Sequence, residues 1–339
     1  MNNISIEPSF WSGRSVVVTG AGGFIGSHLV QQLVEGGATV RAFVRYNSRA
    51  DVGLLKQLPT DSYRSIEIIA GDLRDHAAVF QAILGADTVF HLGAIISIPY
   101  SYVHPVETAN SNFIGTLNVL QACRTHNVRR LIHTSTSEVY GSAIRVPIDE
   151  DHPLQGQSPY SASKIGADML AESYFRAYDL PVVVVRPFNT YGPRQSARAV
   201  IPTIITQALT QPMIRLGSLN PRRDFTYVGD TVRGFLLAAQ VRNPEILGQV
   251  FNLGTGRDIS IGELVDVILR IVGREIPVET DDSRIRPSKS EVMRLISDNC
   301  RARESLNWIP QTDFQAGLTE TIAWIEANLQ KYRIGHYEI

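Results

Sequence analysis

A glycine-rich segment directly after a short apolar run constrains the fold of this 339-residue chain more than any other feature. The run Ser15–Thr19 has the length and β-branched content of a buried strand, and Phe24–Glu35 has the spacing of a helix with one apolar face. Between them, Gly20, Gly23 and Gly26 permit a tight turn and let backbone N–H groups at a helix N-terminus approach a pyrophosphate. The segment predicts a dinucleotide-binding turn, with a purely structural glycine turn as the alternative.

Strand and helix patterns alternate through the first half of the chain. Further strands are expected at 39–44, 66–69, 88–92, 130–134 and 181–186, and long helices at 106–126 and 160–178. This alternation predicts an α/β fold with a Rossmann-type doubly wound parallel sheet. After residue 190, prolines divide the chain into shorter pieces, with helices expected at 200–210, 230–240, 260–272 and 313–329. We therefore expect a Rossmann domain over residues 1–190 and a smaller C-terminal α+β lobe over 191–339, with interleaved segments.

Composition excludes several classes of protein. The formal net charge is −1 and no basic run appears, so a nucleic-acid-binding face is not expected. No stretch of about 18 apolar residues occurs, which argues against a membrane span, and the N-terminus does not read as a signal peptide. Cys123 and Cys300 are too few for a disulfide framework, so a cytoplasmic location is expected.

Three side chains suggest acid–base chemistry. Tyr160 and Lys164 are four residues apart and share one face of the expected helix. An ammonium beside a phenol favours the phenolate, which can accept a proton from a hydroxyl near neutral pH. Glu138, which follows Thr136 and Ser137, adds a second acid–base group, as a reaction that also breaks C–H and C–O bonds requires. A surface Tyr–Lys pair and an ion-paired strand-end glutamate are the alternatives.

The end of the second expected strand bears on the choice of dinucleotide. NAD sites usually place a carboxylate there for the ribose hydroxyls, whereas this chain has no acid before Asp51. Arg45 and Arg49 suit a 2′-phosphate, so NADP is favoured over NAD, with solvated arginines as the alternative. Asp72 and Leu73 are expected near the adenine, unless Asp72 caps a helix.

Seven different short motifs are spread along nearly the whole chain, from Val16 to about Pro310. They are Gly20-x-x-Gly23-x-x-Gly26, Asp72-Leu73, His91-Leu92-Gly93-Ala94, Asn112-x-x-Gly115-Thr116, Tyr160-x-x-x-Lys164, Arg186-Pro187-Phe188-Asn189-x-Tyr191-Gly192-Pro193 and Arg223-Asp224-Phe225. Together they resemble the extended short-chain dehydrogenases/reductases of the NAD-dependent epimerase/dehydratase family, which act on nucleotide-activated sugars.

The resemblance implies a set of site residues. The implied cofactor-binding residues are Gly20, Gly23, Phe24, Ile25, Gly26, Arg45, Asp72, Leu73, Leu92, Ala94, Tyr160 and Lys164. The implied catalytic residues are Thr136, Glu138, Tyr160 and Lys164, and the implied substrate-binding residues are Ser137, Asn189, Arg223, Arg286 and Glu291. No metal site is implied.

The triplet Thr136-Ser137-Glu138 resembles that of the mannose-type sugar-nucleotide 4,6-dehydratases, whereas epimerases carry no acid at this place. UDP-glucuronate decarboxylases share the triplet, but their tyrosine motif usually reads Tyr-Asp-Glu-Gly-Lys. Here it reads Tyr-Ser-Ala-Ser-Lys. The segments 155–160 and 189–195 are most similar to those of the dehydratases that begin nonulosonic-acid pathways of the legionaminic-acid type, from a nucleotide-linked N-acetylglucosamine.

The implied reaction is C4 oxidation of a nucleotide hexose, loss of water across C5–C6, and hydride return to C6, with NADP or NAD held tightly throughout. Tyr160 would take the O4 proton and Thr136 would hydrogen-bond O4. Glu138 would serve as base at C5 and as acid at the departing 6-hydroxyl, because Ser137 stands where some relatives have Asp. A UDP-glucuronate decarboxylase, a C4-epimerase and a non-catalytic dinucleotide-binding sensor remain alternatives. The resemblance also implies a homodimer formed through the helix that carries Tyr160 and the long helix before the fifth expected strand.

Overall fold

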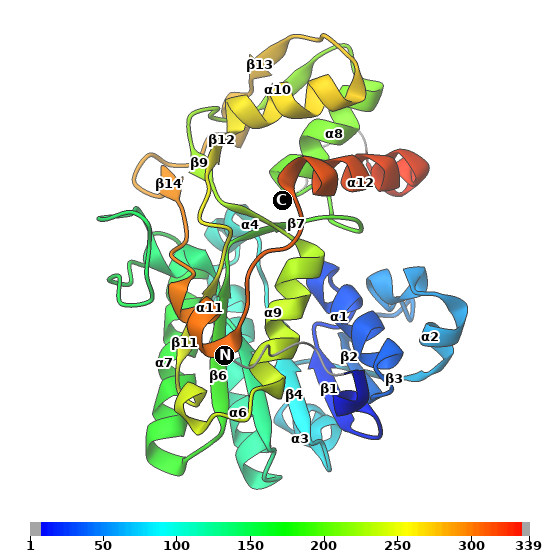
Figure 1. Ribbon diagram of the computed structural model, residues 1–339, viewed down its shortest axis with the longest axis vertical. Helices are drawn as coiled ribbons and strands as arrows, with labels where there is room; N and C mark the ends of the chain where they lie inside the picture. The colour runs from blue at the N-terminus through cyan, green and yellow to red at the C-terminus, as the bar shows by residue number, and fades with distance from the viewer. Residues whose placement is uncertain (1–7, 334–339) are drawn as a thin grey trace.

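Seven parallel strands form the central sheet of the computed structural model, which describes residues 8–333 (Figure 1). The strands lie in the order β11, β6, β5, β4, β1, β2, β3. Their bounds are β1 Ser15–Thr19, β2 Thr39–Arg45, β3 Ile66–Gly71, β4 Thr88–His91, β5 Arg130–Thr134, β6 Val182–Pro187 and β11 Val250–Leu253. Because β2 and β4 flank β1 on opposite sides, a crevice opens at the carboxyl ends of β1 and β4. The predicted Rossmann-type sheet is confirmed.

Helices cover both faces of the sheet, because successive strand side chains enter two different cores. Val16 and Val18 of β1 enter one core and Val17 enters the other. The first core is covered by α1 (Phe24–Glu35), α9 (Val228–Gln240) and α11 (Cys300–Leu306), and the second by α3 (His76–Ile83), α6 (Gly115–Thr125) and α7 (Pro159–Tyr178). Burial on both faces explains why strands such as β6 are continuous apolar runs.

The helix predicted over 106–126 is built from three joined pieces. A π-helical segment, η3 (Asn110–Ile114), separates α5 (Pro105–Ala109) from α6. Within it, the Asn112 side chain accepts from the backbone N–H of Ile95 at 2.8 Å and donates to the Ile95 carbonyl at 2.9 Å. The π-helical segment thus ties α6 to the loop that follows β4, at the crevice. The remaining short helices of the first half are η1 Pro8–Trp11, η2 Gly53–Gln57, α2 Thr60–Arg64, α4 Ile98–Val103 and η4 Ser137–Tyr140.

A smaller lobe lies over the carboxyl edge of the sheet (Figure 1). Its core lies between α8 (Val200–Thr210), α10 (Ile261–Val272) and α12 (Phe314–Ala327). All four helices predicted after residue 190 are present, with ends within two residues of those expected. Short strands of two or three residues form three small sheets apart from the main one, and the sequence does not predict them, because so few residues show no alternation. They are β7 Asn189–Tyr191, β8 Ile214–Leu216, β9 Arg222–Arg223, β10 Phe225–Tyr227, β12 Ile259–Ser260, β13 Val278–Thr280 and β14 Arg294–Leu295.

Segments after residue 190 also return to the first lobe. Strand β11 pairs with β6 in the main sheet, and α9 packs against α1. The predicted boundary between two domains at residue 190 therefore stays a prediction, because segments from both sides of it build the first lobe. Among the helices between residues 8 and 333, none combines the length and the apolar character that a membrane crossing requires.

Candidate active site

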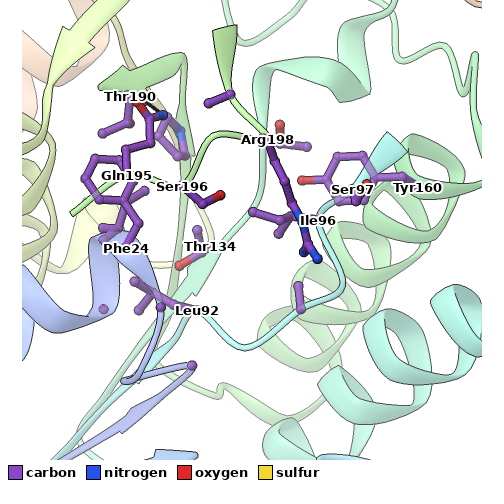
Figure 2. Close-up of a pocket in the computed structure, with 18 of the residues that line it drawn as sticks. Phe24, Leu92, Ile96, Ser97, Thr134, Tyr160, Thr190, Gln195, Ser196 and Arg198 are labelled. Carbon is purple, nitrogen blue, oxygen red and sulfur yellow. Dashed lines mark hydrogen bonds between the residues drawn. The ribbon is translucent and has the colours of Figure 1, made fainter. Parts of the chain in front are cut away.

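A cleft of about 760 Å³ follows the carboxyl edge of the sheet beneath the smaller lobe. The loops after β1, β2, β4, β5 and β6 form its walls, and residues 195–199 close it from the smaller lobe. Figure 2 shows its two sides, where Phe24, Thr190 and Gln195 lie across from Ile96, Ser97 and Tyr160. Volume and position match those of a site for a large organic ligand at a topological switch point.

The glycine-rich turn forms a phosphate cradle at one end of the cleft. Gly20 has φ +68°, and a Cβ there would lie 2.7 Å from the backbone nitrogen of Gly93. A Cβ on Gly26 would overlap the carbonyl oxygen of Gly20. Gly23, at the N-cap of α1, offers no side chain to the first N–H groups of that helix. These N–H groups and the helix dipole therefore fit the pyrophosphate of a dinucleotide.

Charged groups of both signs lie beyond the cradle, at the end of β2. Arg45 lines the cleft, and its Nη2 donates to Glu107 Oε1 at 3.1 Å. Asn47 and Asp51 also line the cleft, and Asp51 forms an ion pair with Lys56. Arg45 therefore lies where the sequence predicted, but the carboxylate of Glu107 partly neutralises its positive charge. Arg49 does not line the cleft.

Asp72 and Leu73 do not line the cleft. Asp72 accepts hydrogen bonds from the backbone and the guanidinium of Arg74. The alternative in which Asp72 caps a helix is wrong, because Asp75 caps α3 by accepting from the backbone of Ala77 and Ala78. Contact between Asp72 and an adenine stays a prediction.

The catalytic wall is built where β5 and α7 meet. Thr136 caps the short helix η4 by accepting from the backbone N–H of Glu138 at 3.2 Å. A capping box between Ser158 and Ser161 fixes the start of α7, so Tyr160 lies in its first turn. Thr136, Ser137, Glu138 and Tyr160 all line the cleft, as the sequence predicted for a reacting centre.

Lys164 lies beneath this wall rather than in it. Its side chain is 3% exposed, and its Nζ donates to the carbonyl oxygen of Thr134 at 2.8 Å. Burial lowers the pKa of Lys164 to about 8, while the charge of Asp168 acts in the opposite direction.

The expected tuning of Tyr160 needs a correction. Burial raises the pKa of the Tyr160 phenol, a hydrogen bond with Thr136 lowers it, and the nearby charge of Glu138 raises it further. Desolvation is the largest of these effects, and Lys164 is not among the groups that shift this pKa, so the predicted lowering by the lysine is not found. The proximity of Glu138 to this phenol nevertheless brings both predicted acid–base groups to one place.

A cluster of charged residues forms the opposite end of the cleft. Arg223, on β9, donates to Glu291 Oε1 at 3.4 Å, and Arg286 Nη1 lies 3.8 Å from the same oxygen. Burial lowers the pKa of Arg223, whereas the charge of Glu138 acts in the opposite direction, as does that of Glu291. Two arginines share one carboxylate of their own, so the cluster keeps positive charge for a phosphate-bearing ligand. Arg286 lines the cleft directly, whereas Arg223 and Glu291 lie behind it.

Several buried polar atoms on cleft-lining side chains have no hydrogen-bond partner among the described residues. They are Thr134 Oγ1, Asn189 Oδ1, Gln195 Oε1 and Arg286 Nη1. Because unpaired buried polar groups cost free energy, they indicate a polar ligand that satisfies them.

Helix α1 also supports the segment from the smaller lobe. His28 Nε2 lies 2.9 Å from the carbonyl oxygen of Pro193, and Arg194 donates to Gln31 Oε1 at 2.6 Å. The next residues, Gln195 onward, line the cleft. The helix that begins at the phosphate cradle therefore also holds the part of the wall that the smaller lobe contributes.

Most of the predicted site residues meet in this cleft. Those that line it are Gly20, Gly23, Phe24, Ile25, Gly26, Arg45, Leu92, Ala94, Thr136, Ser137, Glu138, Tyr160, Asn189 and Arg286. Cleft-lining residues that the sequence did not predict include Asn47, residues 51–53, Ile96, Ser97 and the segment with Gln195, Ser196, Arg198 and Ala199. The last of these directly follows the Tyr191-Gly192-Pro193 motif, which was the one signal that pointed to it.

Comparison with known proteins identifies the family. Residues 17–321 match the family model described as GDP-mannose 4,6 dehydratase. The chain therefore belongs to the extended short-chain dehydrogenase/reductase family of sugar-nucleotide epimerases and dehydratases, and is an enzyme of that NAD-dependent class.

Individual relatives divide between two activities. A putative UDP-glucose 4-epimerase of Methanocaldococcus jannaschii is 32% identical over 323 residues, covering 92% of this chain and 99% of the relative. A dTDP-glucose 4,6-dehydratase of Actinoplanes sp. is 33% identical over 319 residues, covering 92% of this chain and 98% of the relative. The solved structure of DesIV, a dTDP-glucose 4,6-dehydratase from Streptomyces venezuelae with NAD and TYD bound, has a TM-score of 0.80 at 30% identity. It covers 94% of this chain and 99% of DesIV.

Proposed function

We propose that this protein is a nucleotide-sugar 4,6-dehydratase. The observation that carries the proposal is the position of Glu138, a cleft carboxylate whose charge acts on both Tyr160 and Arg223. A C4-epimerase needs only the group that moves the O4 proton. A carboxylate between that group and the phosphate-binding end suits removal of a proton from C5.

The first step rests on the catalytic wall. Tyr160, as phenolate, accepts the proton of the sugar 4-hydroxyl, and Thr136 donates a hydrogen bond to O4. Burial disfavours the phenolate, so the proposal requires the ammonium of Lys164, one helical turn below, to stabilise that form. A nicotinamide dinucleotide, bound on the glycine cradle, supplies a hydride acceptor for C4 and later a hydride donor for C6.

The second step belongs to Glu138. The C4 ketone acidifies C5–H, and Glu138 takes that proton as the C5=C6 double bond forms. The C6–O bond breaks, and the same carboxyl protonates the departing hydroxyl, so water leaves. The other cleft-lining carboxylate of the described residues, Asp51, belongs to the loop whose Gly53 packs on Gly22 of the cradle, so Glu138 performs both transfers. The proton from O4 replaces the one lost from C5, and the net change is loss of one water.

For the substrate we propose a nucleotide-linked N-acetylglucosamine or a related hexose, on the resemblance of segments 155–160 and 189–195. The paired arginines Arg223 and Arg286 suit its diphosphate. Ser137 and Asn189 line the cleft where they reach sugar hydroxyls, and Glu291 stays the predicted partner of the nucleotide ribose.

A panel of sugar nucleotides tests the proposal. The enzyme is incubated with UDP-N-acetylglucosamine, GDP-mannose and UDP-glucuronate, and the products are separated from substrate by chromatography and identified by mass spectrometry. Loss of water from one of them is expected. Loss of carbon dioxide would identify a decarboxylase, and an isomer of equal mass a C4-epimerase. Bound dinucleotide without turnover on the whole panel would favour a sensor.

The Glu138→Gln variant separates the two steps. Dehydration should fall by about 10²- to 10⁴-fold, whereas oxidation at C4 should continue and be visible as reduced dinucleotide at 340 nm. Glu172→Gln is the control, because Glu172 is a partly exposed carboxylate of α7 that pairs with Arg176 and lies outside the cleft. Product formed at the wild-type rate by Glu138→Gln would overturn the assignment.

The choice of dinucleotide rests on Arg45. The sequence favoured NADP because Arg45 suits a 2′-phosphate. Two features now favour NAD, since Glu107 shares the charge of Arg45 and the Asp51 carboxylate would repel a phosphate. Released cofactor from the purified protein, measured by mass, distinguishes NAD from NADP.

We keep two further predictions as proposals. Helices α5 and α7 and the π-helical segment η3 pack together and expose Val106, Ile114 and Met169, which suit a homodimer interface. Light scattering of the wild type and of Met169→Glu tests it, with a monomeric variant expected.

A cytoplasmic location is proposed on the two free cysteines, Cys123 and Cys300.

A further inference from the structure

A buried charged cluster lies directly beneath the catalytic wall. Tyr160, Lys164 and Asp168 follow one another at four-residue spacing on α7, so they share the helix face that meets the sheet. Lys164 is 3% exposed and Asp168 is 1% exposed. Neither the motif nor the mechanism above uses Asp168.

The carboxylate of Asp168 is fully engaged. Its Oδ1 lies 3.2 Å from His133 Nε2, and its Oδ2 accepts from Ser135 Oγ at 2.7 Å. Arg186 donates to Oδ2 from Nε at 3.2 Å and from Nη2 at 2.9 Å. Burial alone would raise the pKa of Asp168, but the hydrogen bond with His133 and the charge of Arg186 lower it to about 2. The group is therefore a carboxylate throughout the physiological range.

The balance of buried charge depends on this one group. Arg186 and Lys164 are the two cations of the cluster, and Asp168 is the anion next to them. Burial lowers the pKa of His133, so its ring adds no positive charge near neutral pH. The other titratable groups that face the cluster are His91 on β4, Glu138 and Tyr140 on η4, and Tyr160 on α7 itself. Without the carboxylate, two cations would share a dry site.

We infer that Asp168 is a positioning residue that keeps the Lys164 ammonium charged and holds Ser135 in place beside the reacting threonine. The inference rests on the proposed function, because it gives Lys164 its task. Among residues 8–333, the hydrogen-bond partner of the Lys164 ammonium is the carbonyl of Thr134, so a neighbouring negative charge is what favours its protonated form. The same carboxylate fixes Ser135, between the residue that binds Lys164 and Thr136.

Asp168 would therefore determine the pH range in which the enzyme is active. The negative charge of Asp168 raises the pKa of Lys164 and also that of Tyr160. Replacing the carboxylate with an amide lowers both, so the enzyme would work at lower pH. A merely structural side chain would lower activity at every pH and leave the shape of the profile unchanged.

Lysine NMR tests the inference without any reaction. Lys56, Lys164, Lys289 and Lys331 are the lysines of the chain, so ¹³Cε-lysine labelling gives a readable spectrum, and Lys164→Arg assigns the signal. In Asp168→Asn the Lys164 midpoint should fall by about one unit or more, a tenfold change in the ratio of ammonium to amine. Glu172→Gln is the control, because Glu172 lies on the same helix but pairs with Arg176 at the surface. An unchanged midpoint in Asp168→Asn would overturn the inference.

Two further measurements complete the test. If Asp168→Asn does not fold, the wild-type titration decides, because a neutral Lys164 amine at pH 7 would contradict the inference. Where Asp168→Asn turns over substrate, its pH optimum should move to lower pH, and Asp168→Glu should restore it. If the protein acts on no sugar nucleotide, the proposed function is wrong. The NMR titration still tests the effect of Asp168 on Lys164 separately.

Discussion

The two ends of the cleft are built from different material. At the cradle end, the backbone of one continuous turn, Gly20–Gly26, makes the site. The absence of side chains at Gly20 and Gly26 lets backbone atoms approach closely. At the sugar end, side chains from β9, from the loop at Arg286 and from η4 converge from positions far apart in sequence. A backbone site tolerates no added atom, whereas a side-chain site can exchange groups and change its substrate. This contrast fits a family in which relatives of this chain carry the names of both epimerases and dehydratases.

The largest effect should come where the two ends meet. Tyr160→Phe removes the group proposed to move the O4 proton, so kcat should fall by about 10²- to 10⁴-fold. Dinucleotide content should stay at the wild-type level, measured by absorbance after denaturation. Tyr178→Phe, on the exposed end of the same helix, is the control. Equal loss of bound dinucleotide and of activity in Tyr160→Phe would show that the catalytic wall and the cradle do not act separately.

Arg223→Met sharpens the comparison at the sugar end. Losing a charge-assisted contact costs about 1.5–3 kcal/mol, which corresponds to a rise in KM for the sugar nucleotide of roughly 10- to 150-fold. Dinucleotide affinity should not change. The control is Arg215→Met, because Arg215 is a surface arginine of the same lobe with its own partner, Glu279. A KM within twofold of the wild type would remove Arg223 from the binding site.

At the cradle, Gly26→Ala places a methyl group against the carbonyl oxygen of Gly20. Overpacking of this kind costs about 1–3 kcal/mol, and dinucleotide affinity should fall with stability. Thermal unfolding with and without dinucleotide measures both. In the control Gly262→Ala, the new Cβ would have its nearest neighbour, Leu219, 3.8 Å away, so no loss is expected. Full dinucleotide affinity in Gly26→Ala would contradict a backbone-built cradle.

The smallest effect is expected for Arg45→Ala. Arg45 is exposed, and its pair with Glu107 contributes about 0–1 kcal/mol, so stability should hardly change. If the arginine receives a 2′-phosphate, affinity for NADP should fall several-fold relative to NAD. An unchanged ratio of the two affinities would show that the cradle end does not select the dinucleotide through this side chain.

The same contrast explains what could be predicted from sequence. The parallel sheet and the cradle were readable because their residues are contiguous and their spacing is periodic. Thr136, Glu138 and Tyr160 were found by motif, and the structure brings them to one wall. The cleft residues at 195–199 were missed because their position depends on how the smaller lobe packs. The pKa of Tyr160 was misjudged because spacing on a helix reveals neighbours but not burial.

The contact between His28 and Pro193 has a thermodynamic consequence. Because α1 begins at the cradle and also holds the segment before residue 195, we expect ligand binding at one end to change the affinity at the other. Linkage requires any such coupling to be reciprocal, so dinucleotide and sugar nucleotide must change each other's affinity by the same factor. Calorimetry in both orders of addition measures that factor, which His28→Ala should bring closer to one. A factor of one in the wild-type protein would mean that the two halves of the cleft bind independently.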